Sequence, residues 1–336
     1  MTQRRHHQSG CGRVLVDTQA RLHLGFLDMS GTLGRRFGSL GLSIAGFHTE
    51  LCAHRAADFS AQGAGAERAL RYAREIAGQL GLRGGLRLEL RSAIPDHLGL
   101  GSGTQMALAV GRAVAALCDR AMSTRDVAAC LRRGGRSGIG IGAFDQGGFL
   151  VDSGVGEDGA VPPVTARLAF PDEWRVLLVM DARGQGLHGA RELDAFRRLP
   201  PFPREVSAHL CHLTLMQILP GVQERRLQPV ADGIAELQRR VGDHFAPAQG
   251  GRFTSTAVAD ALAWIDSLGF TGIGQSSWGP TGFALLPSEA DAQSVLRMTR
   301  QRFGDLSSLR FVVTRAHNQG SRIELQPQFD ALKEMH

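Results

Sequence analysis

The sequence has almost no lysine. Lys333 is the only one, so all but one of the 38 basic residues are arginine, and the formal net charge is +6. A guanidinium group binds phosphates and carboxylates through two parallel hydrogen bonds, so the bias suits a protein that handles small polyphosphates or carboxylates. Genome base composition also produces such a bias. The sequence has no dense basic tract and no basic segment interleaved with aromatic residues, which disfavours nucleic acid as a partner.

The sequence also lacks an apolar run long enough to cross a membrane. Its first ten residues are basic, but a polar stretch follows where a signal peptide has its apolar segment. The five cysteines are scattered and have no metal-binding spacing (Cys11, Cys52, Cys118, Cys130 and Cys211). Reduced thiols of this kind are typical of a reducing compartment. We therefore expect a cytoplasmic protein with no membrane partner.

The remaining composition is that of an ordinary globular protein. Hydrophobic residues make up 43% and charged residues 21% of the 336 positions, which suits one large domain or two medium ones. Apolar periodicity predicts helices over Ala66–Leu80, from Gly103 to Leu117, after a capping box at Ser123–Asp126, and over Arg204–Leu219, Pro229–Val241 and Ser288–Phe303. Strands are expected at Gly85–Arg91, Val176–Met180, Thr281–Leu286 and Arg310–Thr314.

This order of elements mixes strands and helices without strict βαβ repetition, which favours an α+β fold. The character of the sequence changes near Pro162-Pro163. We therefore place a boundary at about residue 165, between an N-terminal domain of residues 1–165 and a C-terminal domain of residues 166–336. Within the second domain, we expect Pro220-Gly221 to separate two helices.

One block, IPDHLGLGSGTQMALAVGRAVAAL at Ile94–Leu117, places bare backbone between a predicted strand and a predicted helix. The first N–H groups of a helix have no internal partner, and the helix dipole adds positive potential there. The residues from Gly99 to Thr104 therefore predict a phosphate cradle. The spacing is neither a Walker A loop, because no lysine follows the glycines, nor a Rossmann fingerprint. The alternative is a turn that only packs a helix on a sheet.

Two further glycine-rich stretches occur along the chain. The first is Gly138–Gly142, followed by Asp145–Gly148, and the second is Gly272–Phe283. Three such loops in one chain indicate a shared site.

The same segments resemble the motifs of the GHMP kinase superfamily, which includes galacto-, homoserine, mevalonate and phosphomevalonate kinases. PDHLGLGSGTQMALA resembles its P-x-x-x-G-L-G-S-S-x-A motif. Asp17–Asp28 resembles its N-terminal motif, with Arg21 at the usual basic position, and Gly272–Phe283 resembles its C-terminal glycine motif. The resemblance covers most of the chain in the right order. It implies a two-domain GHMP-kinase-like fold, with a ribosomal-S5-like N-terminal domain and a ferredoxin-like C-terminal domain.

Finer details are similar to one branch, the beta-ribofuranosylaminobenzene 5'-phosphate synthases of tetrahydromethanopterin biosynthesis. These details are HLGLGSGTQ, RLHLGFLD, GGRSGIGIGAFDQGGFLVDSG, GQGLHGARE and GQSSWGPTGF. Such an enzyme condenses phosphoribosyl pyrophosphate with 4-aminobenzoate or 4-hydroxybenzoate and releases carbon dioxide and pyrophosphate. The resemblance implies a phosphoribosyl-type glycosyl transfer with coupled decarboxylation. That reaction needs a stabilised pyrophosphate and two well-placed substrates.

One departure bears on the alternatives. Mevalonate-kinase-like members carry a catalytic carboxylate in a Ser-Gly-Ile-Asp segment, whereas here Ser137-Gly138-Ile139 is followed by Gly140. Some kinases of the superfamily also lack this base, so an ATP-dependent small-molecule kinase remains the alternative. A non-catalytic metabolite sensor is disfavoured, because the chain keeps all three glycine loops.

Resemblance and residue chemistry together give the candidate site. The candidates for catalysis are Arg21, His23, His97 and Asp145. The candidates for binding phosphate or substrate are Gly99, Gly101, Ser102, Gly103, Thr104, Gln105, Arg136, Ser137, His188, Ser276, Ser277 and Trp278. Trp278 is expected to stack on the aromatic substrate, and His188 to close over it. Ordinary packing is the alternative for the histidines and the tryptophan.

Mg²⁺ is the expected cofactor, with Asp28 and Asp145 as its carboxylate ligands. A turn or helix-terminus role is the alternative for both. His209 and His212 lie three residues apart on a predicted helix, but no third ligand is evident, so we interpret them as packing or surface residues. The expected partners are the two small-molecule substrates and, as is typical of such enzymes, a second copy in a homodimer.

Overall fold

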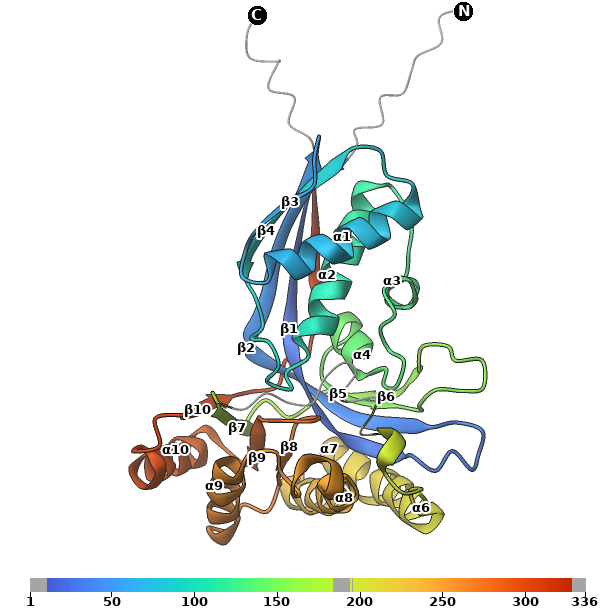
Figure 1. The fold of residues 1–336 in the computed structure, drawn as a ribbon. Coiled ribbons are helices and arrows are strands. Elements are labelled where there is room, and N and C mark those ends of the chain that lie inside the picture. The colour runs from blue at the N-terminus through green and yellow to red at the C-terminus, as the bar shows by residue number, and fades with distance from the viewer. Residues whose placement is uncertain (1–10, 184–193, 195, 328–336) are drawn as a thin grey trace, which may run out of the picture.

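The fold is built on two sheets, shown in Figure 1, in a computed structural model that describes residues 11–183, 194 and 196–327. The larger sheet has seven strands in the order β11-β1-β2-β4-β3, with β5 paired to β2 and β6 paired to β5. The pair of β3 and β4 is parallel and the other pairs are antiparallel. These strands are β1 (Cys11–Asp28), β2 (Phe37–Ala56), β3 (Ser60–Gly63), β4 (Gly85–Ser92), β5 (Phe149–Asp152), β6 (Val164–Leu168) and β11 (Arg322–Pro327).

Helices cover one face of this sheet (Figure 1): α1 (Ala66–Leu80), α2 (Ser102–Leu117), α3 (Thr124–Cys130) and α4 (Ile139–Asp145). Helix α2 lies against β1 and β2, and its predicted apolar face is fully buried there, as Met106, Val110 and Val114 illustrate. The predicted helix over residues 66–80 is confirmed, and so is the capping box of Ser123 and Asp126 at the start of α3.

The smaller sheet is antiparallel, with the strand order β10-β7-β9-β8. Its strands are β7 (Arg175–Asp181), β8 (Ile273–Gln275), β9 (Gly282–Leu286) and β10 (Leu309–Thr314). Between β7 and β8 lie α6 (Arg204–Leu213), the π-helix η1 (Thr214–Ile218), α7 (Leu219–Gln223), α8 (Leu227–Gln249) and α9 (Thr256–Ser267), and α10 (Glu289–Phe303) joins β9 to β10. Because the strands follow a β-α-β-β-α-β order, this half is ferredoxin-like, as predicted.

The last strand returns to the first sheet. β11 follows β10 in the chain, yet it pairs with β1, from Cys11 opposite Pro327 to Asp17 opposite Arg322. β6 also crosses the predicted boundary at residue 165 and stays in the first sheet. The division into residues 1–165 and 166–336 therefore separates the two sheets except for β11 and the end of β6. By pairing with β1, β11 covers an edge that would otherwise be open to other chains.

The helical region after Pro203 differs from the prediction. Its turns continue from α6 through η1 into α7, and the break falls at residues 224–226 instead of Pro220-Gly221. Pro220 is the second residue of α7 and directly follows the wider turns of the π-helix η1, so the helical turns continue through it. Among the described residues, no helix is both long enough and apolar enough to span a bilayer.

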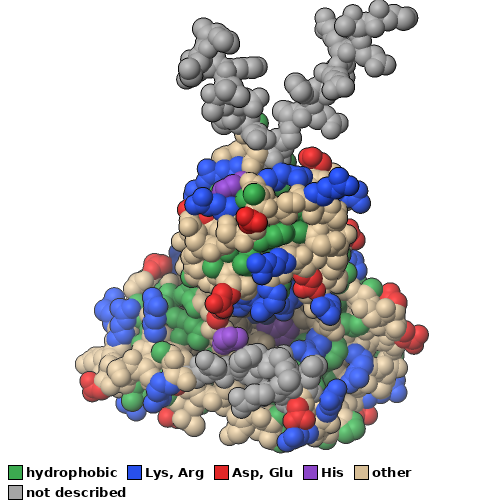
Figure 2. Space-filling model, turned by 45° about the horizontal axis from the view of Figure 1, so that its top comes forward, with side chains coloured by type: hydrophobic (Ala, Val, Ile, Leu, Met, Phe, Trp, Pro, Cys, Tyr) green, Lys and Arg blue, Asp and Glu red, His purple; other side chains and the backbone are tan. Residues whose placement is uncertain are grey.

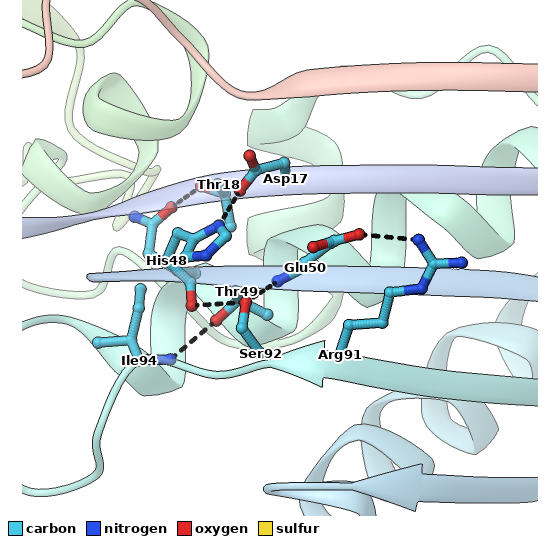
Figure 3. Close-up of polar contacts among 9 residues, drawn as sticks. Asp17, Thr18, His48, Thr49, Glu50, Arg91, Ser92 and Ile94 are labelled. Carbon is cyan, nitrogen blue, oxygen red and sulfur yellow. Dashed lines mark hydrogen bonds and ion pairs between the residues drawn. The ribbon is translucent and has the colours of Figure 1, made fainter. Parts of the chain in front are cut away.

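Polar contacts across β2 and β4 anchor the chain where it leaves the sheet (Figure 3). The hydroxyl of Ser92 donates to the carbonyl of His48 and accepts from the N–H of Glu50. The N–H of Ile94 donates to the hydroxyl of Thr49 over 3.3 Å. Since Ser92 and Ile94 directly precede the first glycine loop, these bonds fix where that loop begins.

A bulge interrupts β1 next to a predicted site residue. The register between β1 and β2 shifts between His23 and Gly25. Gly25 has φ +125°, and a Cβ there would lie 2.2 Å from the Leu237 side chain on α8. Bulges near active sites commonly redirect a side chain. Here the missing side chain lets α8 pack directly on β1 beside His23.

Two helical glycines test how closely α2 packs against α3. A Cβ at Gly111 on α2 would lie 2.2 Å from Val127 Cγ1, whereas a Cβ at Gly78 on α1 would meet nothing within 4 Å. We expect Gly111→Ala to lower the free energy of unfolding by about 1–3 kcal/mol through overpacking. We expect the matched Gly78→Ala to raise it by up to about 1 kcal/mol through helix propensity. Urea unfolding measures both, and equal stabilisation would contradict the close contact of α2 with α3.

Candidate active site

Three segments that are far apart in the sequence meet at the carbonyl oxygen of Gly99. Arg21 on β1 donates to it from Nη1 over 2.7 Å, and the hydroxyl of Ser276 donates to it over 2.7 Å. The N–H of Arg21 also donates to the carbonyl of Leu100 over 3.1 Å. The N-terminal strand, the first glycine loop and the third glycine loop are therefore joined at one point.

The third loop is also bound to the main chain of β1. The N–H of His23 donates to the Ser276 hydroxyl over 3.0 Å, and the N–H of Ser277 donates to the His23 carbonyl over 3.1 Å. The Ser276 side chain thus accepts from β1 and donates to the glycine loop. These bonds connect the loops. Because the Ser276 side chain is fully buried, it is not available to a substrate.

Both loops use the left-handed region of backbone conformation. Gly99 and Gly101 have φ values of +77° and +84°, and two non-glycine residues, His97 and Ser277, have +59° and +56°. A Cβ at Gly99 would lie 2.4 Å from the backbone oxygen of Ser276. Left-handed conformations of this kind concentrate at functional sites when the surrounding structure enforces them.

The start of α2 presents main-chain donors. Gly101 caps the helix without a side chain, and its carbonyl accepts from the N–H groups of Thr104 and Gln105. The N–H groups of Ser102 and Gly103 donate to no acceptor within the described part of the chain. Free amides at the positive end of a helix bind anions, so the geometry matches the predicted phosphate cradle.

A cleft opens over this cradle, with about 1060 Å³ of empty space that includes its open mouth. Four arginines, Arg21, Arg68, Arg71 and Arg133, line it together with the loop residues, and none of the described lining residues is acidic. Figure 2 shows a hollow between the two halves of the molecule, with basic side chains gathered at its border. The cleft is therefore built for a ligand with several negative charges.

Two of these arginines are held in place. Arg133 donates from Nη2 to the Tyr72 hydroxyl, and its guanidinium lies 5.1 Å from the Tyr72 ring centroid. Arg68 pairs with Asp96 over 2.5 Å. The Nε atoms of Arg68 and Arg133 are buried and have no hydrogen-bond partner among the described residues. Buried donors usually have partners, so these atoms indicate a ligand that completes the site.

A second pocket lies on the other side of Ser277 and Trp278, which line both. It has about 400 Å³ of empty space, a volume that includes its open mouth, and it is also lined by His23, Gly25, Phe26, Gln238, Val241, Gly242, Phe245, Gln249, Arg252 and Gln275. The Trp278 ring centroid lies 4.5 Å from that of Phe245. Three aromatic rings, those of Phe26, Phe245 and Trp278, line the pocket together with polar side chains, so it offers a flat ring both stacking surfaces and hydrogen-bond partners.

His23 in this pocket is uncharged. Burial, followed by the positive charges of Arg21 and Arg136, lowers its pKa from 6.5 to about 3. A hydrogen bond with its own backbone acts in the opposite direction, while Nε2 is buried without a partner among the described residues. This arrangement makes Nδ1 the donor of the neutral ring, and Nε2 the acceptor.

Comparison with known proteins assigns this chain to a family. Residues 66–152 match the GHMP kinases N terminal domain, and residues 218–305 match the GHMP kinases C terminal domain. The beta-ribofuranosylphenol 5'-phosphate synthase of Archaeoglobus fulgidus is 34% identical over 325 residues, which cover 92% of this chain and 98% of that protein. The chain belongs to this synthase family of the GHMP superfamily. The protein of the same name from Methanocaldococcus jannaschii is 29% identical and covers 92% of this chain and 100% of its own length.

Solved structures share the GHMP fold at low sequence identity. Mevalonate-3-kinase from Thermoplasma acidophilum aligns with a TM-score of 0.66 and 12% identity, and covers 95% of this chain and all of that chain. Homoserine kinase from Cytophaga hutchinsonii aligns with a TM-score of 0.62 and 16% identity, and covers 96% of this chain and all of that chain. These alignments concern the fold alone.

The GHMP fold brings most of the predicted binding residues together. Those that line the cleft are Arg21, His97, Gly99, Gly101, Ser102, Gly103, Thr104, Ser277 and Trp278, and His23 lines the second pocket. Arg136 lies near this pocket, with its guanidinium 4.9 Å from the Phe196 ring centroid. His188 lies outside the described residues.

Other predicted binding residues have internal partners in this GHMP-family chain. Gln105 is fully buried, accepts from the Thr18 hydroxyl and donates to the carbonyl of Gly140. The Ser137 hydroxyl donates to Asp152 over 3.0 Å, so the anion it faces is this internal carboxylate. Gln105 and Ser137 therefore shape the site from behind and do not line the cleft.

The two predicted metal ligands do not line the cleft either. One carboxylate oxygen of Asp28 accepts from the N–H and hydroxyl of Ser30, which makes a turn. Asp145, at the end of α4, accepts from the Thr124 hydroxyl over 2.5 Å. Within the described residues, no group of three or more His, Cys, Asp or Glu side chains is arranged to hold a metal ion.

Sequence reasoning missed the arginines that α1 and the segment after α3 contribute. Arg68 and Arg71 lie three residues apart on one side of α1, and Arg133 directly precedes Gly134-Gly135. Their spacing on a predicted helix was a usable signal, because two like charges one turn apart destabilise a helix. The buried carboxylate of Asp152 was also missed. Burial raises its pKa against four hydrogen bonds that lower it.

The neutral state of His23 predicts a pH dependence of stability. The folded-state pKa is lowered to about 3, so between pH 6.5 and 3 protonation favours the unfolded chain. Stability is therefore lost as the pH falls below 6.5, at up to about 1.4 kcal/mol per pH unit. We expect His23→Asn to lose about 2 kcal/mol less than the wild type between pH 6.5 and 4.5. Urea unfolding at both pH values measures this, and parallel losses would contradict a neutral buried His23.

The cradle predicts selective loss of anion binding. Gly103 has an ordinary backbone conformation, and a Cβ there would lie 3.9 Å from Arg133 Nη1 without a clash. We expect Gly103→Val to raise the Kd of inorganic pyrophosphate at least about tenfold, because the side chain fills the space beside the free amides. Gly78→Val, on an exposed turn of α1, is the matched control. Unchanged binding in Gly103→Val would remove the cradle from the site. Isothermal titration calorimetry provides the Kd values.

Proposed function

We propose that this protein is a beta-ribofuranosyl-benzene 5'-phosphate synthase. It condenses phosphoribosyl pyrophosphate with 4-hydroxybenzoate or 4-aminobenzoate and releases carbon dioxide and pyrophosphate. The observation that carries the proposal is the adjacency of a cationic cleft, whose described lining has no acidic residue, and a pocket with three aromatic rings, which share Ser277 and Trp278. The names of three relatives, each a beta-ribofuranosylphenol 5'-phosphate synthase, support it. The reaction belongs to tetrahydromethanopterin biosynthesis.

The cleft suits the leaving group of this reaction. The bond between the anomeric carbon and the diphosphate breaks with its electron pair on oxygen, so negative charge grows on the diphosphate. The free amides of Ser102 and Gly103 and the guanidinium of Arg21 lie where such charge would be held. Preorganised donors of this kind commonly supply the largest part of a rate enhancement.

The second pocket suits the aromatic acid. The ring carbon that carries the carboxylate forms the new bond to the sugar, and the bond to carbon dioxide then breaks, which returns its electrons to the ring. No ring proton has to be removed. Trp278 and Phe245 provide flat surfaces for the ring. Because Ser277 also lines the cleft, a ring in this pocket would be separated from the diphosphate cradle only by the shared wall.

His23 explains why the aromatic substrate has a hydroxyl or amino group opposite its carboxylate. Its Nε2 is an acceptor without a partner among the described residues, and a phenol O–H or an aniline N–H is a donor. A hydrogen bond to Nε2 pushes electron density from the substituent toward the ring carbon opposite, which is the one that attacks. 4-Hydroxybenzoate and 4-aminobenzoate can both donate this hydrogen bond. The word "phenol" in the relatives' names supports the hydroxybenzoate.

The kinase alternative is less well supported. A phosphoryl-transfer site of the superfamily uses a carboxylate after Ser-Gly-Ile, and Gly140 occupies that place here. A Cβ at Gly140 would lie 2.8 Å from Thr104 Cγ2, so an acidic side chain has no room there.

Mg²⁺ remains a proposal for which this site has no ready ligands. Asp28 and Asp145 have other partners, and the lining of the described cleft contains no carboxylate. A hard cation needs oxygen ligands, so here they would come from the diphosphate, water and the hydroxyls of Ser102 and Thr104.

Two further parts of the proposal concern the setting. We propose a cytoplasmic enzyme, which the free thiols of Cys52, Cys118, Cys130 and Cys211 support. We also propose a homodimer. The exposed side chains of Leu215 and Met216 on η1 form the described apolar surface that suits such a contact.

One assay tests the function. Purified protein is given phosphoribosyl pyrophosphate and carboxyl-labelled 4-hydroxybenzoate or 4-aminobenzoate, with and without Mg²⁺ and ATP, and released labelled carbon dioxide is counted. We expect release without ATP and in a one-to-one ratio with pyrophosphate. A phosphorylated product formed only with ATP would instead support the kinase, and absence of label release from both acids would refute the synthase.

A further inference from the structure

The cleft has more positive charge than the cradle at α2 explains. We use the name arginine wall for Arg68, Arg71 and Arg133, which line the cleft from α1 and from the segment after α3. None of them belongs to the three glycine motifs. Two of their guanidinium groups lie against one side chain, since those of Arg71 and Arg133 are 5.7 Å and 5.1 Å from the Tyr72 ring centroid.

Without a ligand, the arginine wall destabilises the folded protein. Arg68 and Arg71 repel each other one turn apart on α1, and Asp96 neutralises only Arg68. The buried Nε atoms of Arg68 and Arg133 have no partner among the described residues. A buried donor without a partner destabilises the unliganded protein. A purely structural role would not retain three converging cations with unmet donors, whereas a bound anion accounts for both features.

The wall lies beside the cradle and is distinct from it. The Cβ position of Gly103, in the first turn of α2, is 3.9 Å from Arg133 Nη1. Arg68 and Arg71 extend the basic surface away from this point along α1. The cleft therefore has one anion site of main-chain amides and, next to it, a second of guanidinium groups. A ligand that fills both has two phosphate groups joined by a short spacer.

We propose that the arginine wall binds the phosphate monoester at carbon 5 of the ribose, while the cradle holds the diphosphate at carbon 1. The identity of the donor rests on the proposed function. Held at both ends, the sugar has its anomeric carbon fixed near the shared wall of Ser277 and Trp278. Guanidinium groups suit a monoester, because they form paired hydrogen bonds with its oxygens.

The test compares two probes that each carry one end of the donor. The Kd values of ribose 5-phosphate and of inorganic pyrophosphate are measured by isothermal titration calorimetry. We expect Arg71→Gln to raise the Kd of ribose 5-phosphate at least about tenfold and that of pyrophosphate less than about threefold. We expect the reverse selectivity for Gly103→Val. Arg74→Gln is the matched control, because Arg74 lies one turn further along α1 and its guanidinium lies over Phe59, away from the cleft.

The outcomes separate this inference from the function itself. Equal weakening of both probes in Arg71→Gln would make the wall part of the diphosphate site and overturn the inference. Unchanged ribose 5-phosphate binding, or none to the wild type, would also overturn it. If selective weakening is found but no labelled carbon dioxide is released from either acid, the second phosphate subsite stands and the synthase proposal fails.

Discussion

The two hydrogen bonds to the Gly99 carbonyl determine how the rest of the site is arranged. Arg21 and Ser276 both donate to this oxygen, and they come from opposite ends of the chain. A carbonyl that accepts twice cannot rotate freely, so the peptide that leads into α2 has one orientation. Gly99 and Gly101 adopt left-handed conformations in this peptide, and the amides of Ser102 and Gly103 have no acceptor within the described part of the chain. Exposed donors at the α2 terminus are thus a consequence of tertiary structure.

The same junction relates the two pockets. Ser276 and Ser277 bind the main chain of β1 on both sides of His23, so the aromatic pocket and the anion cleft are built on one rigid connection. β11 pairs with the edge of β1 that faces away from β2, and so supports β1 from that side. Since a bond between two substrates forms only when both are held at a fixed separation, this rigidity is what the proposed reaction requires of the protein.

Much of this site was readable from the sequence, and the reason is local. Glycine spacing at Gly99–Thr104 and the apolar periodicity after it are local signals, so they predicted a loop that leads into a helix, whereas the bonds from Arg21 and Ser276 that orient this loop come from distant segments. The long strand β2 was missed, because its alternation is interrupted by glycines and a bulge. The internal roles of Gln105 and Ser137 and the positions of Asp28 and Asp145 depend on partners distant in the sequence, such as Thr18 and Asp152. No pattern in a single sequence shows such partners.

Electrostatics links the absence of acid to the neutrality of His23. Burial is the main cause of the lowered pKa of His23, and the positive charges of Arg21, which faces the cleft, and of Arg136 lower this pKa further. A carboxylate in the cleft would weaken the effect of these charges, because it would neutralise the arginines and raise the pKa of the histidine. Mevalonate-kinase-like members use such a carboxylate to receive a hydroxyl proton, whereas the proposed glycosyl transfer releases no ring proton. The acid-free lining is therefore consistent with a GHMP fold that has exchanged proton chemistry for charge stabilisation.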